Sequence, residues 1–501
     1  MLLTLLLLPL VGAIAVAALP KDLSKMLGLG VAAATLVVGA VAAVRFEPDQ
    51  GMQFTEDWTW MKAFGVHFAL GLDGLGLLMV LLTVLLVPLV LVAEWSSPQT
   101  ATSPRAFVAW TLALEALSLA VFCATDVFLF YVVFEATLIP AYFLVGGFGR
   151  HGRGAAALKF LMFQLAGGLV LLASVIGLYV VSASQGTPSY LLSDLMSLDI
   201  GTDAGRWLFL GFLFAFAVKA PIFPLHTWLA DTTEKATPGT SVLLVCVLDK
   251  IGTFGMLRFC LGIFPEASQW ATPLVVTLAL ISIVYGAFLA IGQDDILRLI
   301  GLTSLSHFGF ITLGIFVLTP QGGTGAVLYM VNHGLGTAIL FLVAGYMFHR
   351  SGTTRISEMG GIEKVTPVLA GLFLVAGLAT LGLPGLSPFV SEFLVLASAF
   401  DYAWYVGAIA VTGIVLAAIY VLWMYQRTMT GPSRAPFEGT RDLGLREIAA
   451  VAPIVAALVF FGFYPAPLLD AADPMVHGLL AHVGAPDDGP TVPTTAAEED
   501  N

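Results

Sequence analysis

Apolar stretches of about 20 residues, the length that a helix needs to cross a bilayer, recur along the whole 501-residue chain. Only 11% of the residues are charged and 58% are hydrophobic, whereas about 25% are charged in soluble domains. We therefore expect an all-α membrane protein and exclude a water-soluble enzyme. Fourteen membrane-spanning helices are predicted at 1–20, 27–45, 67–93, 106–123, 127–148, 155–182, 206–229, 238–262, 272–292, 295–318, 324–349, 366–400, 403–426 and 447–469.

Lysines and arginines are divided unevenly between alternate loops. Fifteen of the 21 lie in one set of loops and four lie in the other. Because cytoplasmic loops carry the excess of basic residues, we expect the first set to face the cytoplasm and both termini to lie outside. Residues 17–19 before Pro20 leave cleavage after the first span open as an alternative. The acidic tail at 485–501 is expected to be disordered.

Several classes of site have no signature in this chain. Cys123, Cys246 and Cys260 lie within apolar stretches and form no CxxC motif, which excludes an iron–sulfur cluster or zinc site held by this chain. No Gly-rich nucleotide-binding motif is found, and the net charge of −12 disfavours nucleic acid as a partner. No spacing of His and carboxylates suits a metal site.

Four ionisable side chains within the predicted spans stand out as candidates: Glu135, Lys219, Lys250 and Glu392. Inserting a charged side chain at the middle of the membrane costs about 2.5–3.5 kcal/mol of free energy on insertion scales. Packing ion pairs, or lysines that reach the interface, are the simpler alternative. However, Lys219 and Glu392 both lie beside paired prolines, which interrupt a helix and free its carbonyls. A broken helix beside an ionisable group is typical of ion sites in transporters.

The two predicted breaks fall in the seventh and twelfth spans, five spans apart. This spacing fits two inverted five-helix repeats formed by helices 4–8 and 9–13. The expected division is therefore helices 1–3 at 1–105, a first half at 106–262, a second, inverted half at 272–426, a last helix at 447–469, and the tail.

Histidines form a second set of candidates. His307 and His333 lie in the second half, with His349 near the end of a span and His226 beside the first break. Imidazole titrates near the pH of the cell, which suits proton relay. A hydrogen-bonded packing role is the alternative for each of them.

These segments resemble the antiporter-like membrane subunits of respiratory complex I, a family shared with the Mrp cation/proton antiporters. The resemblance covers about residues 65–425. It is carried by Leu72-Asp73-Gly74, Asp126 to Pro140, Val218-Lys219-Ala220-Pro221, Asp249-Lys250-Ile251-Gly252-Thr253-Phe254-Gly255, Leu302-Thr303-Ser304-Leu305-Ser306-His307, Asn332-His333-Gly334-Leu335 and Leu383-Pro384-Gly385 to Glu392-Phe393.

The resemblance implies roles for the four charged residues. Glu135 and Lys219 would be the coupled acid and lysine, Lys250 the central relay, and Glu392 the exit-side group. The position of Glu392 is usually Lys in the complex I subunits L and N and in the Mrp antiporters, but Glu in one other branch. Asp249 replaces a residue that is usually apolar and is expected to hold the charge of Lys250 more firmly.

One loop departs from the family pattern. After Trp228-Leu229 the family usually has Pro-Asp-Ala-His-Thr-Glu-Ala-Pro, whereas this chain has Ala-Asp-Thr-Thr-Glu-Lys-Ala-Thr-Pro at 230–238. The loop His is missing and the acid is displaced, so the resemblance implies no role for this loop.

We therefore expect a proton-translocating subunit of NADH:quinone oxidoreductase in the bacterial plasma membrane. Its partners would be the lipid bilayer and other membrane subunits, including L and N. NADH, FMN, iron–sulfur clusters and quinone would bind to partner subunits, with no cofactor in this chain. An Mrp-type sodium/proton antiporter subunit is the main alternative, and a structural scaffold is a second one.

Overall fold

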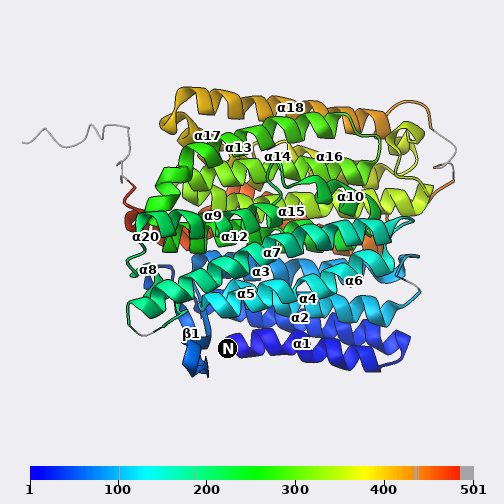
Figure 1. Ribbon diagram of the computed structural model, residues 1–501. Helices are drawn as coiled ribbons and strands as arrows, with labels where there is room; N and C mark the ends of the chain where they lie inside the picture. Colours follow the sequence, from blue (N-terminus) through cyan, green and yellow to red (C-terminus); the bar gives the residue numbers. More distant parts are fainter. Residues whose placement is uncertain (101, 187, 434–436, 438, 486–501) are drawn as a thin grey trace, which may run out of the picture.

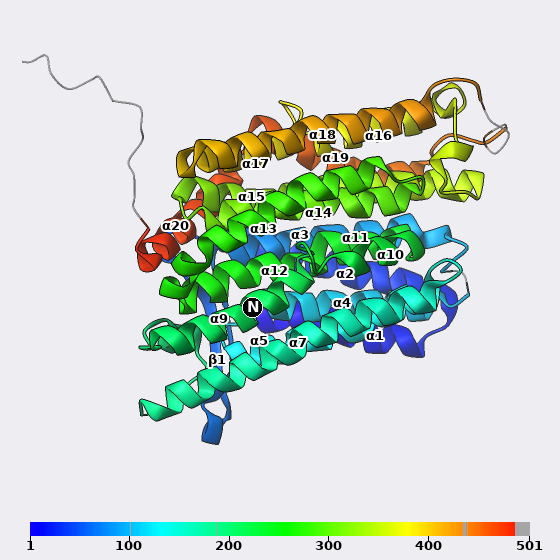
Figure 2. The same cartoon turned by 45° about the horizontal axis from the view of Figure 1, so that its top comes forward.

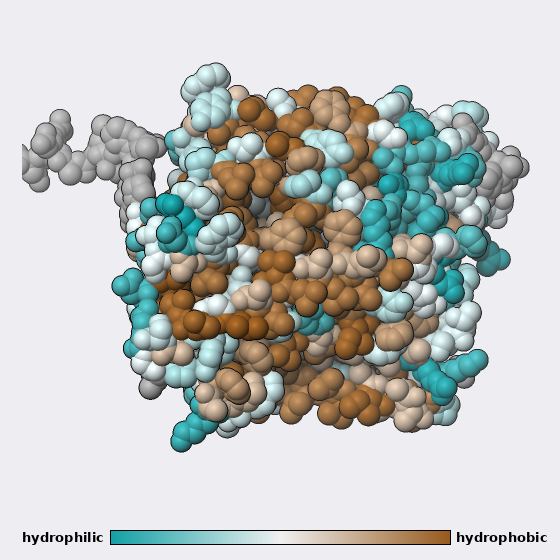
Figure 3. Space-filling view, viewed as in Figure 1, coloured by the Kyte–Doolittle hydropathy of each residue, from teal (hydrophilic) through white to brown (hydrophobic). Residues whose placement is uncertain are grey.

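The computed structural model describes residues 1–100, 102–186, 188–433, 437 and 439–485. Its long apolar helices run side by side along one axis (Figures 1 and 2). Within the described residues, eleven helical segments are long and apolar enough to cross a membrane. Apolar side chains cover the middle of the bundle, and hydrophilic ones gather towards its two ends (Figure 3). The expectation of a multi-pass membrane protein is confirmed.

The N-terminal part begins with two helices, continues through a hairpin and ends with two further helices. Its elements are α1 (Leu2–Ala18), α2 (Lys21–Arg45), β1 (Gln53–Met61), β2 (Val66–Leu72), α3 (Gly74–Ala93) and α4 (Pro104–Cys123). Short 3-10 turns occur here and later in the chain, at Pro48–Gln50, Lys62–Phe64, Glu94–Ser96, Ile356–Glu358 and Ile362–Lys364.

The middle part contains α5 (Val127–Ala136), α6 (Leu138–Phe148), α7 (Arg153–Ser184), α8 (Leu192–Met196), α9 (Thr202–Lys219), α10 (Thr227–Lys235), α11 (Pro238–Val242) and α12 (Lys250–Gly255). The last part contains α13 (Pro265–Ile291), α14 (Ile296–Phe316), α15 (Pro320–Ser351), α16 (Pro367–Thr380), α17 (Ser387–Tyr402), α18 (Trp404–Met429), α19 (Leu445–Phe463) and α20 (Ala466–Val483).

The expectation that the fold is entirely helical is wrong for residues 53–72. Strand β2 pairs antiparallel with β1, with Trp58 opposite Phe68. The apolar run from residue 67 was assigned to a helix because hydropathy does not distinguish a buried strand from a helix. Helix α3 begins only after Asp73, whose carboxylate accepts a hydrogen bond from the Gly76 amide at 2.9 Å.

The helix breaks expected beside the paired prolines are present. Helix α9 ends at Lys219 and α10 begins at Thr227, with Pro221 and Pro224 between them. The indole Nε1 of Trp228 donates to the carbonyl of Val218 at 3.1 Å. The backbone acceptor near the break is therefore satisfied inside the protein, as a membrane interior requires.

The second break separates α16 from α17 at residues 381–386. Here the side chain of Asn332 in α15 donates to the carbonyl of Ser387 at 2.9 Å. The first break is thus supported by Trp228 of the helix that follows it, and the second by Asn332 of α15.

Two further segments differ from the expected helices. The span predicted at 238–262 consists of α11 and α12, which alternate with π-helical turns at Leu243–Leu248 and Met256–Leu261. Its apolar stretch is entirely buried inside the protein. The last helix, predicted at 447–469, ends at Phe463, and an unpredicted helix α20 packs against α3 and α15. Of the tail expected to be disordered, residues 486–501 lie outside the described residues.

Helices α14 and α15 form the centre of the second part of the bundle, and their most apolar membrane-spanning stretches are entirely buried inside the protein. Helix α13 covers α14, and α17 packs against α15. This arrangement places His307 of α14 and His333 of α15 inside the protein rather than against lipid.

Candidate functional site

Lys219 is fully buried at the last residue of α9. Its Nζ donates to the hydroxyl of Thr137 at 3.3 Å and lies 4.6 Å from the centre of the Phe134 ring. Thr137 connects α5 to α6. The lysine therefore points at the interruption between these two helices, which lies two residues after Glu135.

Glu135 is half-buried in α5, and its carboxylate lies against α7. A Cβ placed on Gly168 of α7 would lie 1.7 Å from Oε1 of Glu135, so only glycine leaves room for the carboxylate. Within the described part of the chain, no ion pair of 4 Å or less joins Glu135 to Lys219, although the two charges act on one another electrostatically. The predicted pair is brought together without a direct bond.

Lys250 is fully buried at the start of α12, between the two π-helical turns. Its Nζ lies 2.5 Å from Nδ1 of His333 and 4.3 Å from the centre of the Phe308 ring. Because an ammonium group can only donate hydrogen bonds, Nδ1 of His333 is the acceptor.

Glycines bring α12 directly against the end of α9. A Cβ on Gly252 would lie 2.4 Å from the backbone nitrogen of Ala220. Asp249, the residue before Lys250, is 1% exposed, and neither of its carboxylate oxygens has a hydrogen-bond partner among the described residues. Asp249 is near enough to interact electrostatically with both Lys219 and Lys250, so this chain holds a buried acid close to the two lysines.

Tyr329 connects His307 to Glu392. Nδ1 of His307 lies 2.8 Å from the Tyr329 hydroxyl, and that hydroxyl donates to Oε1 of Glu392 at 2.9 Å. The ring centres of His307 and His333 are 5.2 Å apart. Sequence reasoning missed Tyr329, although its position four residues before His333 places both on one face of a helix.

The carboxylate of Glu392 lies against the second helix break. Gly382 has a φ of +74°, and a Cβ there would lie 1.9 Å from Oε2 of Glu392. A cavity of about 10 Å³ is lined by His307, Tyr329, His333 and Glu392, among other residues. This volume matches roughly one water molecule.

Two other histidines lie apart from the polar contacts that connect Lys250 to Glu392. His226 lies buried in the first break, with its ring 5.6 Å from that of Tyr285, and His349 lies in the last turn of α15. Glu115 of α4 is a buried carboxylate that sequence reasoning missed, although a charge within the span predicted at 106–123 was visible. Neither of its oxygens has a hydrogen-bond partner among the described residues.

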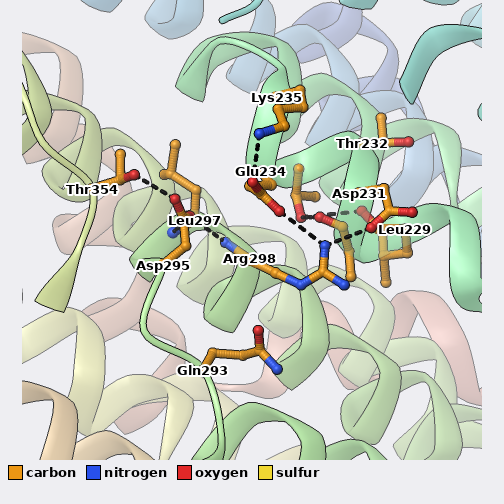
Figure 4. A network of polar contacts seen from close by, with 12 residues as sticks. Leu229, Asp231, Thr232, Glu234, Lys235, Gln293, Asp295, Leu297, Arg298 and Thr354 are labelled. Carbon is orange, nitrogen blue, oxygen red and sulfur yellow. Dashed lines mark hydrogen bonds and ion pairs between the residues drawn. The ribbon is translucent and has the colours of Figure 1, made fainter. Parts of the chain in front are cut away.

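Residues 230–238 were expected to form a loop, but residues 230–235 belong to helix α10, and they contribute to an ionic network (Figure 4). Arg298 of α14 binds Asp231 at 2.5 Å and Glu234 at 2.9 Å, and Lys159 binds Asp231 at 2.6 Å. Burial alone would raise the pKa of Asp231, but the hydrogen bonds from Lys159 and Arg298 outweigh it and lower that pKa. Burial would likewise raise the pKa of Glu234, but the hydrogen bonds and charges of Lys235 and Arg298 outweigh it and lower that pKa. Both acids therefore stay ionised and connect α10 to α7 and α14.

Within the described residues, no group of three or more His, Cys, Asp or Glu side chains is arranged to hold a metal ion. Cys123, Cys246 and Cys260 are buried and unpaired. The chemistry that this arrangement offers is the transfer of protons between amines, imidazoles, a phenol and carboxylates.

Comparison with known proteins gives consistent results over nearly the whole chain. Residues 124–417 match the family described as NADH:quinone oxidoreductase/Mrp antiporter, TM. NADH-quinone oxidoreductase subunit M of Mycobacterium tuberculosis is 47% identical, over 97% of this chain and 95% of that protein.

Two solved structures have the same fold. A chain of respiratory complex I from Thermus thermophilus with bound NADH superposes with a TM-score of 0.89 at 33% identity, covering 97% of this chain and all of that one. A chain of the Mrp complex from Dietzia has a TM-score of 0.85 at 20% identity, covering 97% and 98%, and this likeness concerns the fold alone. The chain belongs to the NADH:quinone oxidoreductase/Mrp antiporter family of membrane proteins.

Proposed function

We propose that this chain is the proton-translocating subunit M of NADH:quinone oxidoreductase, coupling electron transfer from NADH to quinone to proton pumping across the membrane. The observation that carries the proposal is the buried row from Lys250 through His333, His307 and Tyr329 to Glu392. Its members are all groups that can carry or relay protons, and they lie on α12, α14, α15 and α17.

In this proposal Glu135 and Lys219 form a coupled pair, and Lys219 releases its proton when the influence of Glu135 on it weakens. Two unit charges about 4 Å apart, at an effective dielectric of about 20, interact by about 4 kcal/mol. Glu135 and Lys219 lie farther apart than this, so about 4 kcal/mol is the upper bound for their interaction. Moving one charge against roughly 150 mV costs about 3.5 kcal/mol. A change in the influence of Glu135 on Lys219 therefore contributes at most about the free energy that release of one proton requires, and the burial of Lys219 supplies the remainder.

The released proton passes sideways to Lys250, which is the central relay. From there His333 and His307 lead to Glu392, the exit-side group beside the second helix break. The contact of α12 with the end of α9 and the buried Asp249 support the first step. The contacts that connect Lys250 to Glu392 support the second step.

We further propose fourteen membrane crossings, in which helices 4–8 and 9–13 form two inverted repeats with breaks in helices 7 and 12. The N terminus and α20 lie at the same end of the bundle in Figure 1, which agrees with both termini facing outward. The membrane is the bacterial plasma membrane, and the partners include subunits L and N. NADH, FMN, iron–sulfur clusters and quinone belong to partner subunits, and this chain holds no redox centre.

An Mrp-type sodium/proton antiporter subunit is the alternative function. Both families share the fold, but identity to the complex I subunit of M. tuberculosis is 47%, against 20% to the Mrp chain of Dietzia. Replacing sodium with potassium in vesicles that contain the whole complex separates the two functions. Pumping driven by NADH should not change, and a strict sodium requirement would contradict the proposal.

The central experiment measures proton uptake into inverted membrane vesicles, driven by NADH oxidation. Lys250→Ala should abolish most of the uptake and slow NADH:quinone reductase activity. Lys364→Ala, a change of an exposed lysine outside the row, is the matched control and should behave as wild type. Normal coupled turnover in Lys250→Ala, with assembly verified by immunoblot, would rule out the proposed relay.

A further inference from the structure

The hydroxyl of Tyr329 has two polar neighbours and a single proton to share. Tyr329 is 1% exposed in α15, between His307 of α14 and Glu392 of α17. Its hydroxyl donates that proton to Oε1 of Glu392 at 2.9 Å. At the 2.8 Å contact with His307 it can therefore only accept, so Nδ1 of His307 carries a hydrogen.

This assignment also determines which ring nitrogens of His307 and His333 can donate a hydrogen bond and which can accept one. A neutral His307 with its hydrogen on Nδ1 has a lone pair on Nε2, and that atom is buried without a partner in the described residues. His333 accepts from Lys250 at Nδ1, so its hydrogen lies on Nε2, which is also buried and unpartnered there. The two free atoms are a donor and an acceptor on neighbouring rings, beside a cavity that matches roughly one water molecule.

We infer that Tyr329 is a proton-carrying residue that passes a proton from His307 directly to Glu392, without a water molecule in this link. The inference rests on the proposed function and adds a residue to its path. In this step His307 is first protonated at Nε2 and then loses its Nδ1 proton to the Tyr329 oxygen. As that O–H bond forms, the original phenolic O–H bond breaks and its proton bonds to Oε1 of Glu392.

The step conserves atoms and charge and involves no change of oxidation state. An imidazolium and a carboxylate become a neutral imidazole and a carboxylic acid, and the phenol is regenerated. A second transfer requires the hydroxyl to rotate back towards Glu392 and His307 to regain its Nδ1 hydrogen. Tyr329 thus works as a relay only if its hydroxyl is present and free to rotate.

A matched tyrosine provides the control. Tyr420 of α18 is also 1% exposed and acts electrostatically on Glu392, but its hydroxyl has no hydrogen-bond partner in the described part of the chain. Both tyrosines can be changed to phenylalanine with the loss of one oxygen atom. The Tyr329 ring stacks on Phe310 with centres 6.0 Å apart, a contact that Tyr329→Phe keeps.

The experiment compares four variants of the whole complex in inverted vesicles: Tyr329→Phe, Tyr420→Phe, Glu392→Gln, and Tyr329→Phe combined with Glu392→Gln. Because a positioned proton-transfer group contributes at least about 100-fold in enzymes, and a water molecule can occupy the space of the lost oxygen, we expect about a tenfold loss of NADH-driven proton uptake in Tyr329→Phe. Tyr420→Phe should pump as wild type. The double variant should be no worse than Glu392→Gln, since both changes interrupt one path.

The outcomes separate this inference from the proposed function. Defective Glu392→Gln with normal Tyr329→Phe would overturn the role of Tyr329 and leave the exit at Glu392 intact. Normal pumping in both would overturn the path itself. Equal losses in Tyr329→Phe and Tyr420→Phe, or a double variant whose loss is the product of the single losses, would assign Tyr329 to packing.

Discussion

The ammonium group of Lys250 lies 2.5 Å from Nδ1 of His333. The two residues are 83 positions apart, on the segment that ends the first half of the chain and on the long helix α15 of the second. This contact joins the two predicted halves at the level of the buried row. It also places the central lysine in contact with a group that can take its proton.

Replacing His333 with Asn tests whether this contact relays protons. Asn keeps an acceptor close to the position of Nδ1, so the contact with Lys250 should survive, but the second ring nitrogen is lost. We expect at least about a tenfold loss of NADH-driven proton uptake, because the path beyond His333 is interrupted. Fluorescence quenching in inverted vesicles measures the uptake.

His151→Asn is the control, since His151 is exposed on the loop between α6 and α7. It should leave uptake unchanged. If His333→Asn pumps as well as this control, His333 only anchors Lys250.

The contact between Gly168 and Glu135 predicts a strong effect from a small substitution. In Gly168→Ala the added Cβ would overlap Oε1 of Glu135, so the carboxylate must move away and its influence on Lys219 must change. Coupled NADH:quinone reductase activity should fall several-fold while the complex still assembles. Gly154→Ala in the same helix, where a Cβ meets open space, should have no such effect, and equal activities in the two variants would contradict the prediction.

Asp249 offers a test of the step between the two lysines. Neither of its oxygens has a hydrogen-bond partner in the described residues, so Asp249→Asn removes a charge without breaking a hydrogen bond. We expect a several-fold slower coupled turnover with unchanged thermal stability, because both lysines lose a neighbouring group that can take up and release a proton. An unchanged turnover rate would mean that Lys219 and Lys250 exchange protons without this acid.

The pair formed by Asp73 and Arg258 predicts an effect on stability rather than on pumping. The guanidinium binds both carboxylate oxygens, at 2.5 and 2.6 Å, and ties the start of α3 to the second π-helical turn. Removing one partner of a buried pair costs about 3–5 kcal/mol, so Arg258→Gln should lower the free energy of unfolding by about that amount. Urea titration of the detergent-solubilised complex, followed by helicity, checks it.

The pH dependence of this pair follows from Asp73. Burial alone would raise the pKa of Asp73, but the charge and hydrogen bonds of Arg258 outweigh it and lower that pKa. The stabilisation is therefore fully present above the unfolded pKa, about 3.9, and is lost as the pH falls through the lowered folded value. In Arg258→Gln the burial of Asp73 remains without the arginine and raises that pKa, so the difference in stability between wild type and the variant should shrink from pH 7 to pH 5. A difference that grows over this range would contradict the assignment.

Properties that depend on local composition could be predicted from the sequence. The long apolar runs, the four charges within them and the paired prolines each carry a free-energy cost or a steric restriction that does not depend on the rest of the fold. They indicated a membrane protein, the positions of the two helix breaks and the residues worth examining. Hydropathy failed at residues 66–72, because an apolar segment becomes a strand or a helix according to whether a partner strand lies beside it.

Properties that depend on distances between helices were decided only by the tertiary structure. The bridge of Tyr329 from His307 to Glu392, the room that Gly168 leaves for Glu135, and the π-helical turns around Lys250 have no counterpart in hydrophobic periodicity. Periodicity reports which face of a helix is buried, but not which neighbour lies against that face or how closely. A relay requires contacts of about 3 Å between polar atoms, and such contacts exist only once the helices have packed.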